Sequence, residues 1–147
     1  MPGSRSVELR LESKIDSVDA AELIVTGLAR EAGHDEDKIG QLGLAVRESM
    51  VNAVTHGNGC NQDKTVHFSV EVSSAALTVG IRDEGAGFEP GEAPDPTAPD
   101  NLLKTSGRGL LLMRALVDEF SLQRAEPCGM QAKLVTKGPA AGKAKEE

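Results

Sequence analysis

The sequence predicts an α+β fold, a two-layer sandwich in which helices cover one face of a mainly antiparallel sheet. Two observations lead to this prediction. Short segments in which apolar and polar residues alternate are typical of strands, and two of them are close enough to form a hairpin. Two segments with the 3.6-residue apolar period of helices follow the first strand. Helices grouped apart from hairpin strands favour an antiparallel sheet covered on one side.

The first sixty residues predict one strand and then two helices. Alternation of apolar and polar residues predicts a strand over 7–12. The helix that follows is expected to be capped by Asp16 or Ser17. Asp35 then caps a second helix, over about 36–56, whose apolar residues recur at the helical period. These apolar residues are Ile39, Leu42, Val46, Met50 and Ala53.

The rest of the chain predicts a long loop, one helix and four strands. The stretch of about 89–106 holds four of the seven prolines, so it cannot form a continuous helix or strand. A loop of this length in a compact domain is a functional lid or a disordered segment. A helix is expected over 109–118. The four strands are expected near residues 66–72, 77–81, 119–125 and 129–137.

The length of 147 residues suits one domain, which we expect over 1–137, with 138–147 as a disordered tail. The formal net charge of -7 argues against nucleic acid and anionic membranes as direct partners. No apolar run approaches the roughly 18 residues of a membrane span. Cys60 and Cys128 lack metal-ligand spacing, so we interpret them as reduced thiols of a cytoplasmic protein.

The first candidate site lies in the second helix, in the sequence LAVRESMVNAVTHGNG. Glu48 and Asn52 are four residues apart, so a helix brings their side chains to one face. Leu44 and Val51 lie close beside them. A carboxylate and an amide framed by apolar residues suggest the wall of a pocket. The alternative is an ordinary solvated helix face.

The second candidate site is the turn after the strand near 77–81. Asp83 closes this strand, and Gly85 and Gly87 follow at two-residue spacing. Glycine lets a flat ligand approach the backbone, and a neighbouring carboxylate can accept a hydrogen bond from an exocyclic amine such as N6 of adenine. Asp and Gly also suit any tight turn, so a turn without a ligand is the alternative.

The third candidate site is the start of the helix in SGRGLLLMRALVDE. Gly107 and Gly109 flank this start, where free backbone N–H groups and the positive end of the helix dipole favour a phosphate. Arg108 either adds a cation near the phosphates or is a solvated residue. The Walker pattern is missing, and glycine-rich helix starts also occur without a ligand.

These three segments, in this order, resemble the nucleotide-binding motifs of the GHKL ATPases over about residues 7–137. The matching segments are the Glu48/Asn52 helix, the Asp83-x-Gly85-x-Gly87 turn and the Gly107-x-Gly109 helix start. The short chain, the sequence NAVTHGN and the short proline-rich lid resemble the anti-sigma-factor serine-kinase branch of that superfamily. One departure is Met130 after Gly129, because the family usually has Gly-Thr entering the last strand.

The resemblance implies a Bergerat fold that binds ATP and Mg²⁺. It implies that Glu48 is the catalytic residue, a general base on the attacking hydroxyl. It also implies that Asn52 coordinates the Mg²⁺ that bridges the phosphates, and that Asp83 holds the adenine amine. The remaining residues of the implied site line the base or bind phosphate through backbone N–H groups: Gly85, Gly87, Gly107, Arg108 and Gly109.

The implied function is that of a serine-protein kinase, which phosphorylates an anti-sigma antagonist protein and sequesters a sigma factor. The resemblance also suggests a homodimer. Two alternatives stay open. One is an interaction module that binds ATP without transferring phosphate, and such a module could keep Glu48. The other is the ATPase domain of a histidine kinase. The sequence argues against this alternative, because it shows no phosphoacceptor helix hairpin.

The three histidines are scattered along the chain and give no metal-binding pattern. His34 is expected in a surface loop between the first two helices. His56 is expected near a helix end, where a cation suits the helix dipole. His67 alternates with apolar neighbours and is expected on the outer face of its strand.

Overall fold

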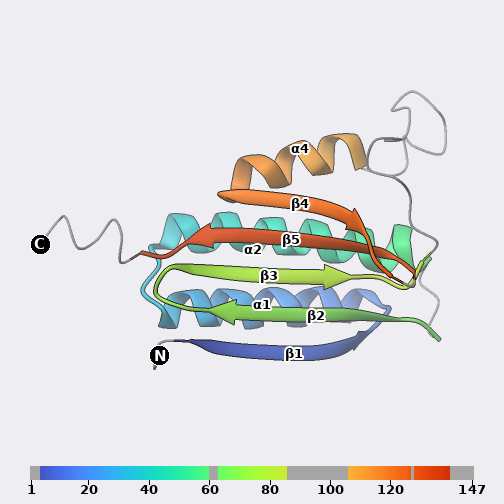
Figure 1. Cartoon of the computed structure of the whole chain (residues 1–147), viewed down its shortest axis with the longest axis horizontal. Helices are drawn as coiled ribbons and strands as arrows, with labels where there is room; N and C mark the ends of the chain where they lie inside the picture. The colour runs from blue at the N-terminus through green and yellow to red at the C-terminus, as the bar shows by residue number, and fades with distance from the viewer. Residues whose placement is uncertain (1–3, 60–62, 86–105, 127, 140–147) are drawn as a thin grey trace, which may run out of the picture.

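The structure, a computed structural model, describes residues 4–59, 63–85, 106–126 and 128–139. Its helices and strands follow the predicted order, and the predicted α+β fold is confirmed (Figure 1). The helical elements are α1 (Ile15–Glu31), α2 (Glu36–Val51), the π-helical segment η1 (Asn52–Gly57) and α4 (Ser106–Leu116). The strands are β1 (Arg5–Glu12), β2 (Thr65–Val72), β3 (Ala76–Arg82), β4 (Glu119–Arg124) and β5 (Met130–Lys137).

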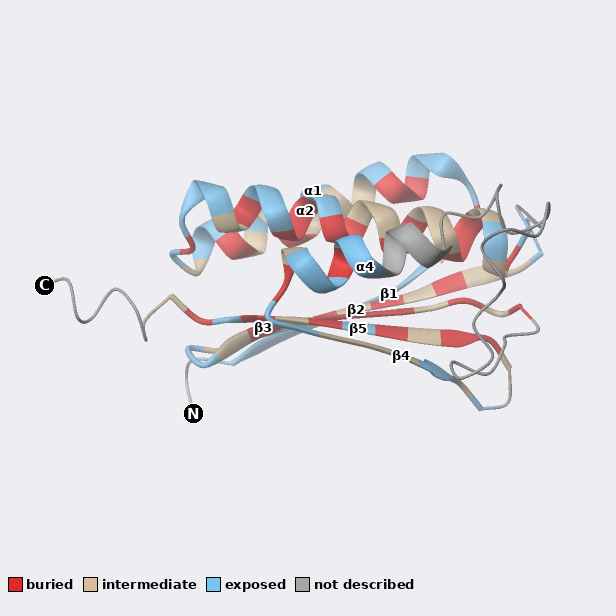
Figure 2. Cartoon of the chain, turned by 90° about the horizontal axis from the view of Figure 1, so that it is seen from above, coloured by how far each residue is buried: buried red, intermediate tan, exposed pale blue. Residues whose placement is uncertain are grey.

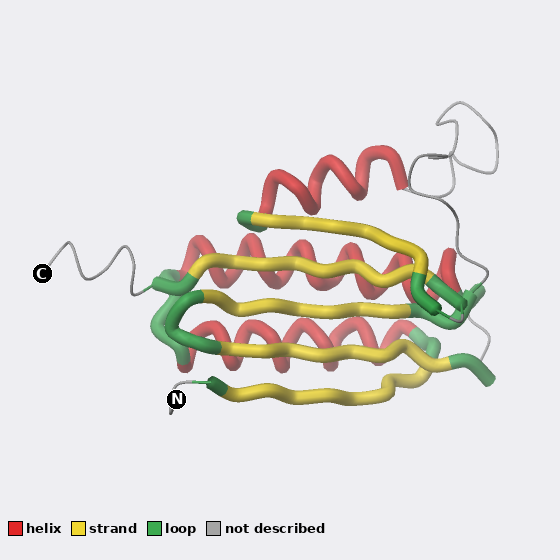
Figure 3. The backbone as a smooth tube through the Cα atoms, in the orientation of Figure 1, coloured by secondary structure: helices red, strands yellow, loops and turns green. Residues whose placement is uncertain are grey.

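The five strands form one sheet in the order β1-β2-β3-β5-β4, and every neighbouring pair is antiparallel (Figure 3). A tight turn joins β2 to β3, as the sequence predicted. In this turn the Ser73 hydroxyl accepts hydrogen bonds from the N–H groups of Ala75 and Ala76, at 3.2 and 3.3 Å. The hydroxyl thus stabilises the turn at one end of the β2–β3 hairpin.

The helices lie on one face of the sheet, and the buried residues concentrate where the two layers meet (Figure 2). The helix α2 contacts both α1 and α4 and lies between them. Alternate residues of the central strands, such as Phe68 and Leu77, belong to the same buried core as Val46 and Met50 of α2. The core is aliphatic almost throughout, and the opposite face of the sheet carries polar side chains.

The two predicted helix caps have different outcomes. The Asp35 carboxylate accepts a hydrogen bond from the N–H of Lys38 at 2.8 Å, so this cap is confirmed. The predicted cap of the first helix is wrong. Lys14 is the N-cap of α1 and makes no side-chain cap hydrogen bond, while Asp16 and Ser17 lie inside the first turn. There Asp16 interacts favourably with the helix dipole instead.

The second helix changes its geometry near its end. The sequence predicted one helix over about 36–56, but α-helical hydrogen bonding stops at Val51 and η1 continues as a π-helical turn to Gly57. The N–H of Asn58 donates to the carbonyl of Ala53 at 2.8 Å, an i to i−5 bond. Such turns are rare, and they are frequent at functional sites. Because of this wider turn, Gly57 reaches the end of β3.

Some predicted segments lie partly outside the described residues. The predicted lid of about 89–106 does so except for Ser106, which begins α4. Of the predicted tail, Gly138 and Pro139 are described, and the Gly138 N–H donates to the carbonyl of Ala75 at 2.7 Å. Among the described helices, none combines the length and the apolar character that a membrane crossing requires.

His34 differs from its prediction. It lies in the turn between α1 and α2, as expected, but its side chain is buried with 7% exposed instead of lying on the surface. Its Nε2 atom has no hydrogen-bond partner within the described ranges. Burial disfavours the charged imidazolium and lowers the pKa of His34.

Candidate functional site

The three predicted site segments meet at one end of the molecule. The end of β3, the start of β5, the segment η1 and the first turn of α4 all lie at the right-hand end in Figure 1. The antiparallel pairing of β3 with β5 brings the end of one strand beside the start of the other. Segments from four distant parts of the sequence therefore share this end.

Asp83 lies at the centre of this end, with only 6% of the residue exposed. Its N–H donates to the carbonyl of Met130 at 3.1 Å. Its Oδ1 atom accepts hydrogen bonds from the N–H of Gly85 at 2.9 Å and from the N–H of Met130 at 3.2 Å. The second oxygen, Oδ2, accepts no hydrogen bond from the residues that the structure describes. The carboxylate is thus fixed through one oxygen and keeps the other for a donor from outside.

Three glycines surround Asp83, and none of them could carry a side chain there. A Cβ atom on Gly57 would lie under 3.0 Å from Asp83 Oδ2, and one on Gly85 would lie equally close to the carbonyl oxygen of Gly57. Gly129 has φ +92, and a Cβ on it would overlap the carbonyl oxygen of Asp83. Backbone without side chains therefore packs around the Asp83 carboxylate. We name these three glycines, Gly57, Gly85 and Gly129, the glycine cradle. The absence of Cβ atoms at these glycines allows the protein's own backbone to approach Asp83 this closely.

Burial raises the pKa of Asp83, because the loss of water disfavours the charged carboxylate. The hydrogen bonds from Gly85 and Met130 oppose this effect by stabilising the charge. A buried carboxylate with a perturbed pKa at a meeting point of elements is a candidate functional residue. A donor group of a ligand would satisfy its second oxygen.

Glu48 and Asn52 lie next to one another along the helix, as the sequence predicted. The N–H of Asn52 donates to the carbonyl of Glu48, so one α-helical turn separates them and their side chains share a face. Both residues are half-buried. The apolar frame predicted around them is only partly formed, because Leu44 is 44% exposed while Val51 is half-buried. Asn52 is also the first residue of η1, whose last residue, Gly57, belongs to the glycine cradle.

The predicted phosphate-binding residues lie in the first turn of α4. Gly107, Arg108 and Gly109 directly follow Ser106, where the helix begins. The first four N–H groups of a helix have no partner within it, which makes this turn suitable for an anion. The helix is held beside α2, where the Ser49 hydroxyl donates to the thioether of Met113. Gly87 lies outside the described residues.

Four residues of this region were not predicted as site residues. Gly57 and Asn58 follow the second helix, and a Gly-Asn pair there is typical of an ordinary helix end. Glu84 lies between the motif residues Asp83 and Gly85, and Gly129 directly precedes Met130, at which the sequence departs from the family pattern. The signal that could have identified Gly129 is glycine next to a strand end, which often marks a close approach of backbone.

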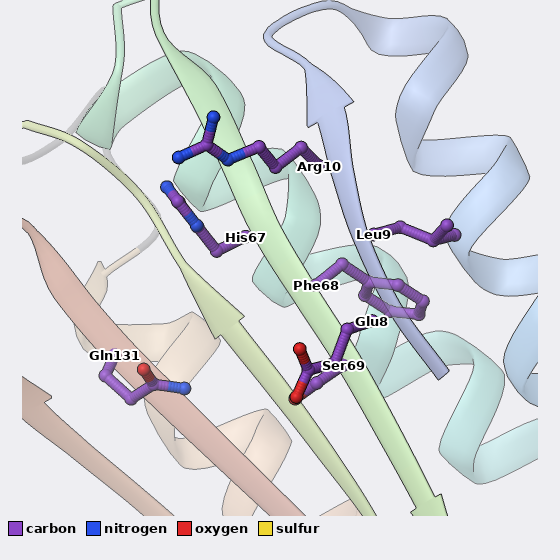
Figure 4. Close-up of a pocket in the computed structure, with 7 residues that line it drawn as sticks. All are labelled: Glu8, Leu9, Arg10, His67, Phe68, Ser69 and Gln131. Atoms are coloured by element: carbon purple, nitrogen blue, oxygen red, sulfur yellow. The ribbon is translucent and has the colours of Figure 1, made fainter. Parts of the chain in front are cut away.

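A hollow of about 390 Å³ lies on the outer face of the sheet, away from the helices (Figure 4). Arg10 and His67 lie side by side at one end of it, and Glu8 lies near Ser69 at the other end. Its lining residues are Glu8, Leu9, Arg10, His67, Phe68, Ser69 and Gln131. None of the predicted site residues lines it. His67, however, forms a hydrogen bond through its Nε2 atom to Glu84 Oε2 at 2.8 Å, and Glu84 directly follows Asp83 in the sequence.

The chain resembles several known proteins. The model of the family described as "Histidine kinase-like ATPase domain" matches residues 11–136, most of the chain. The protein "Serine-protein kinase RsbW" of Bacillus subtilis is 29% identical over 123 residues, which is 80% of this chain and 77% of that protein. The "Anti-sigma F factor" of Clostridium novyi is 26% identical over 133 residues, 88% of this chain and 91% of that protein.

One solved structure has a similar fold. It contains the RsbU and RsbW domains of Rv1364c from Mycobacterium tuberculosis, with a TM-score of 0.64 and 16% identity. The match covers 90% of this chain and 31% of that longer chain. At this identity the likeness concerns the fold. The family model, which matches residues 11–136, shows that this chain belongs to the histidine kinase-like ATPases of the GHKL type.

Proposed function

We propose that the chain is an ATP-dependent serine-protein kinase that phosphorylates an anti-sigma antagonist protein and sequesters a sigma factor. The observation that carries the proposal is the Asp83 carboxylate, which is fixed through Oδ1 and keeps Oδ2 for a donor. The exocyclic amine of adenine is a donor of this kind. The carbonyl at the same position of guanine would face the carboxylate as a second acceptor, so the site favours ATP over GTP.

The surroundings of Asp83 fit the rest of the nucleotide. The glycine cradle lets the backbone pack directly against Asp83, which holds its carboxylate in position toward a base. The first turn of α4, with Gly107, Arg108 and Gly109, offers backbone N–H groups for the phosphates. The Asn52 side chain would supply one oxygen to Mg²⁺. One protein oxygen is enough, because Mg²⁺ is usually bound by few protein groups together with substrate phosphates and water.

Glu48 is the catalytic residue of the proposal. In the transfer step, the serine hydroxyl of the partner protein attacks the γ-phosphorus of ATP and its proton passes to the Glu48 carboxylate. A bond forms between the serine oxygen and phosphorus, the bond from phosphorus to the bridging oxygen breaks, and ADP leaves. The bound Mg²⁺ supplies charge neutralisation on the phosphates. The chain itself holds and orients the reacting groups, which is the main requirement of phosphoryl transfer.

The names of the relatives support the proposed partners of this reaction. RsbW of Bacillus subtilis is named a serine-protein kinase, and the Clostridium novyi relative is named an anti-sigma F factor. We extend both activities to this chain, because each relative matches it over most of its length. The proposal includes the homodimer that the family resemblance suggests and a cytoplasmic location. The same chain then holds a sigma factor until its antagonist is available unphosphorylated.

The test is incubation of the full chain with γ-labelled ATP, Mg²⁺ and candidate antagonists encoded nearby, followed by mapping of the labelled residue. The proposal predicts label on one serine of an antagonist. Binding of ATP without label on any partner would instead support a non-catalytic ATP-binding module. Label on a histidine would support the histidine-kinase alternative.

A further inference from the structure

Glu84 directly follows Asp83, and all of its polar groups are engaged. Its Oε1 atom accepts a hydrogen bond from the N–H of Thr65 at 3.0 Å. Its Oε2 atom lies 3.2 Å from the Thr65 hydroxyl and 2.8 Å from His67 Nε2. Its carbonyl accepts from the Cys128 thiol at 3.8 Å, and its N–H donates to Asn58 Oδ1 at 2.7 Å. The side chain thus ties the chain beyond β3 to the first residues of β2.

Asn58 completes this connection from the side of η1. It is buried, with 3% exposed. Its N–H donates to the carbonyl of Ala53 at 2.8 Å, and its Nδ2 donates to the carbonyl of Thr65 at 3.1 Å. Since its Oδ1 accepts the N–H of Glu84, Asn58 holds η1, β2 and the end of β3 together. We name Asn58 and Glu84, with their partner Thr65, the clamp.

The clamp residues Asn58 and Glu84 directly follow two residues of the proposed nucleotide-binding site. Asn58 follows Gly57, which packs on the Asp83 carboxylate, and Glu84 follows Asp83 itself. The bond from the Glu84 N–H to Asn58 Oδ1 therefore fixes the separation of Gly57 and Asp83. If this bond and its supports are lost, the Asp83 carboxylate is free to tilt, although no group that touches it has changed.

Resting on the proposed function, we propose that Glu84 and Asn58 are positioning residues that determine base specificity. They hold Asp83 so that its second oxygen meets the adenine amine. A single hydrogen bond discriminates between bases only while its acceptor is held in place. A mobile carboxylate bonds less well to the amine of adenine, and it can also move away from the carbonyl oxygen of guanine or hypoxanthine, which would otherwise repel it. The Thr65 N–H and then His67 lower the pKa of Glu84, so its carboxylate stays an acceptor for these bonds at neutral pH.

The test compares Mg-ATP with Mg-ITP, because inosine carries a carbonyl where adenosine carries the amine. Calorimetric titration gives the ratio of the two dissociation constants for the full chain and for Glu84→Ala. Glu84→Ala keeps the backbone bond to Asn58 but removes the carboxylate bonds to Thr65 and His67 that support it. We expect this variant to weaken ATP binding about tenfold and to leave ITP binding nearly unchanged, so that the ratio falls. Glu84→Gln should restore part of the ratio, since its amide oxygen still accepts from the Thr65 N–H.

Ser73→Ala is the matched control at the opposite end of the same hairpin. It removes the hydrogen bonds that the N–H groups of Ala75 and Ala76 donate to the Ser73 hydroxyl. It should lower the stability of the fold without changing the ratio of the ATP and ITP dissociation constants. An unchanged ratio in Glu84→Ala, or an equal fall in Ser73→Ala, would overturn the positioning role. If Glu84→Ala does not fold, Thr65→Val removes one of the bonds to Glu84 and should lower the ratio less, in the same direction.

The same measurements distinguish an error in the positioning role of Glu84 and Asn58 from an error in the proposed function. If the unmutated chain binds neither nucleotide, or binds ATP and ITP equally, the assignment of Asp83 to the adenine amine is wrong and the clamp proposal fails with it. If the unmutated chain prefers ATP and Asp83→Asn abolishes the preference while Glu84→Ala keeps it, the site stands and only the positioning role is wrong.

Discussion

Gly57 lies so close to Asp83 that a Cβ atom on Gly57 would come under 3.0 Å from the carboxylate oxygen Oδ2. Gly57→Ala should therefore displace the carboxylate from its position against η1. We expect Mg-ADP binding to weaken at least about tenfold and the free energy of unfolding to fall by about 1–3 kcal/mol, the usual cost of overpacking. Calorimetric titration and urea unfolding measure the two effects.

Gly40→Ala is the control for this variant, since Gly40 lies in α2 where an added Cβ meets nothing within 4 Å. There, alanine should raise the free energy of unfolding by about 0.5–1 kcal/mol through its helix propensity and leave ADP binding unchanged. If Gly57→Ala binds ADP as tightly as Gly40→Ala, the contact between Gly57 and the Asp83 carboxylate has no part in the site.

Asp83→Asn should separate binding from stability. The amide keeps the Oδ1 acceptor for Gly85 and Met130 but presents a donor to the adenine amine, which should weaken ATP binding by about 1–3 kcal/mol. Burial raises the pKa of Asp83 above the ordinary value of 3.8, so the fold loses stability as the pH rises through this value, where the carboxyl ionises more readily in the unfolded chain. The unbound variant should then unfold at the same or a higher urea concentration. Equal affinity of the unmutated chain for ATP and GTP would contradict the assignment.

His34 should make stability depend on pH. Its burial lowers its pKa below the ordinary value of 6.5, so the unfolded chain binds a proton at a pH where the folded chain does not. The contribution is absent above about pH 6.5 and destabilises the fold as the pH falls through this value toward the lowered pKa. Urea unfolding at pH 7.5 and 5.5 should show a smaller loss for His34→Gln than for the unmutated chain. An equal loss in both would show that other groups carry the effect.

Most of the fold was predictable because it depends on local patterns. Alternation along β2 and β3 and the 3.6-residue period of α2 are set by which face is buried, so they can be recognised without the partner elements. The Asp35 cap was predictable for the same reason. The Lys14 cap was not, because Asp16 and Ser17 are equally good cap residues by type and only the path of β1 into α1 decides where the helix begins.

The site was predictable only in part. Its motif residues have recognisable spacing, and the structure brings Asp83 to the same end of the molecule as α4 and η1. The π-helical turn has no local signature, so its effect on Gly57 could not be predicted. Asn58 and Glu84 are 26 residues apart, and their hydrogen bond exists only once β2 and β3 pair. The ligand roles of the motif residues stay predictions.

Asn52→Ala should abolish the dependence of nucleotide binding on Mg²⁺. The variant loses the oxygen that we assign to the metal, while Asp83 and the glycine cradle are unchanged. We expect its affinity for ADP with Mg²⁺ to fall to the level measured with a chelator, and phosphate transfer to fail with it. Titration with and without Mg²⁺ checks this outcome. An undiminished gain in affinity from Mg²⁺ would show that the metal is held by other groups.

The rate of phosphate transfer by Glu48→Gln tests the central claim most directly. It is measured in a single turnover with γ-labelled ATP and the serine antagonist that the unmutated chain modifies, and ATP affinity is measured on the same preparations. Because glutamine keeps the size and hydrogen bonding of the side chain but cannot take up the proton, ATP and sigma-factor binding should persist while transfer slows by about 10²–10⁴. Transfer by Glu48→Gln at the unmutated rate would contradict the account.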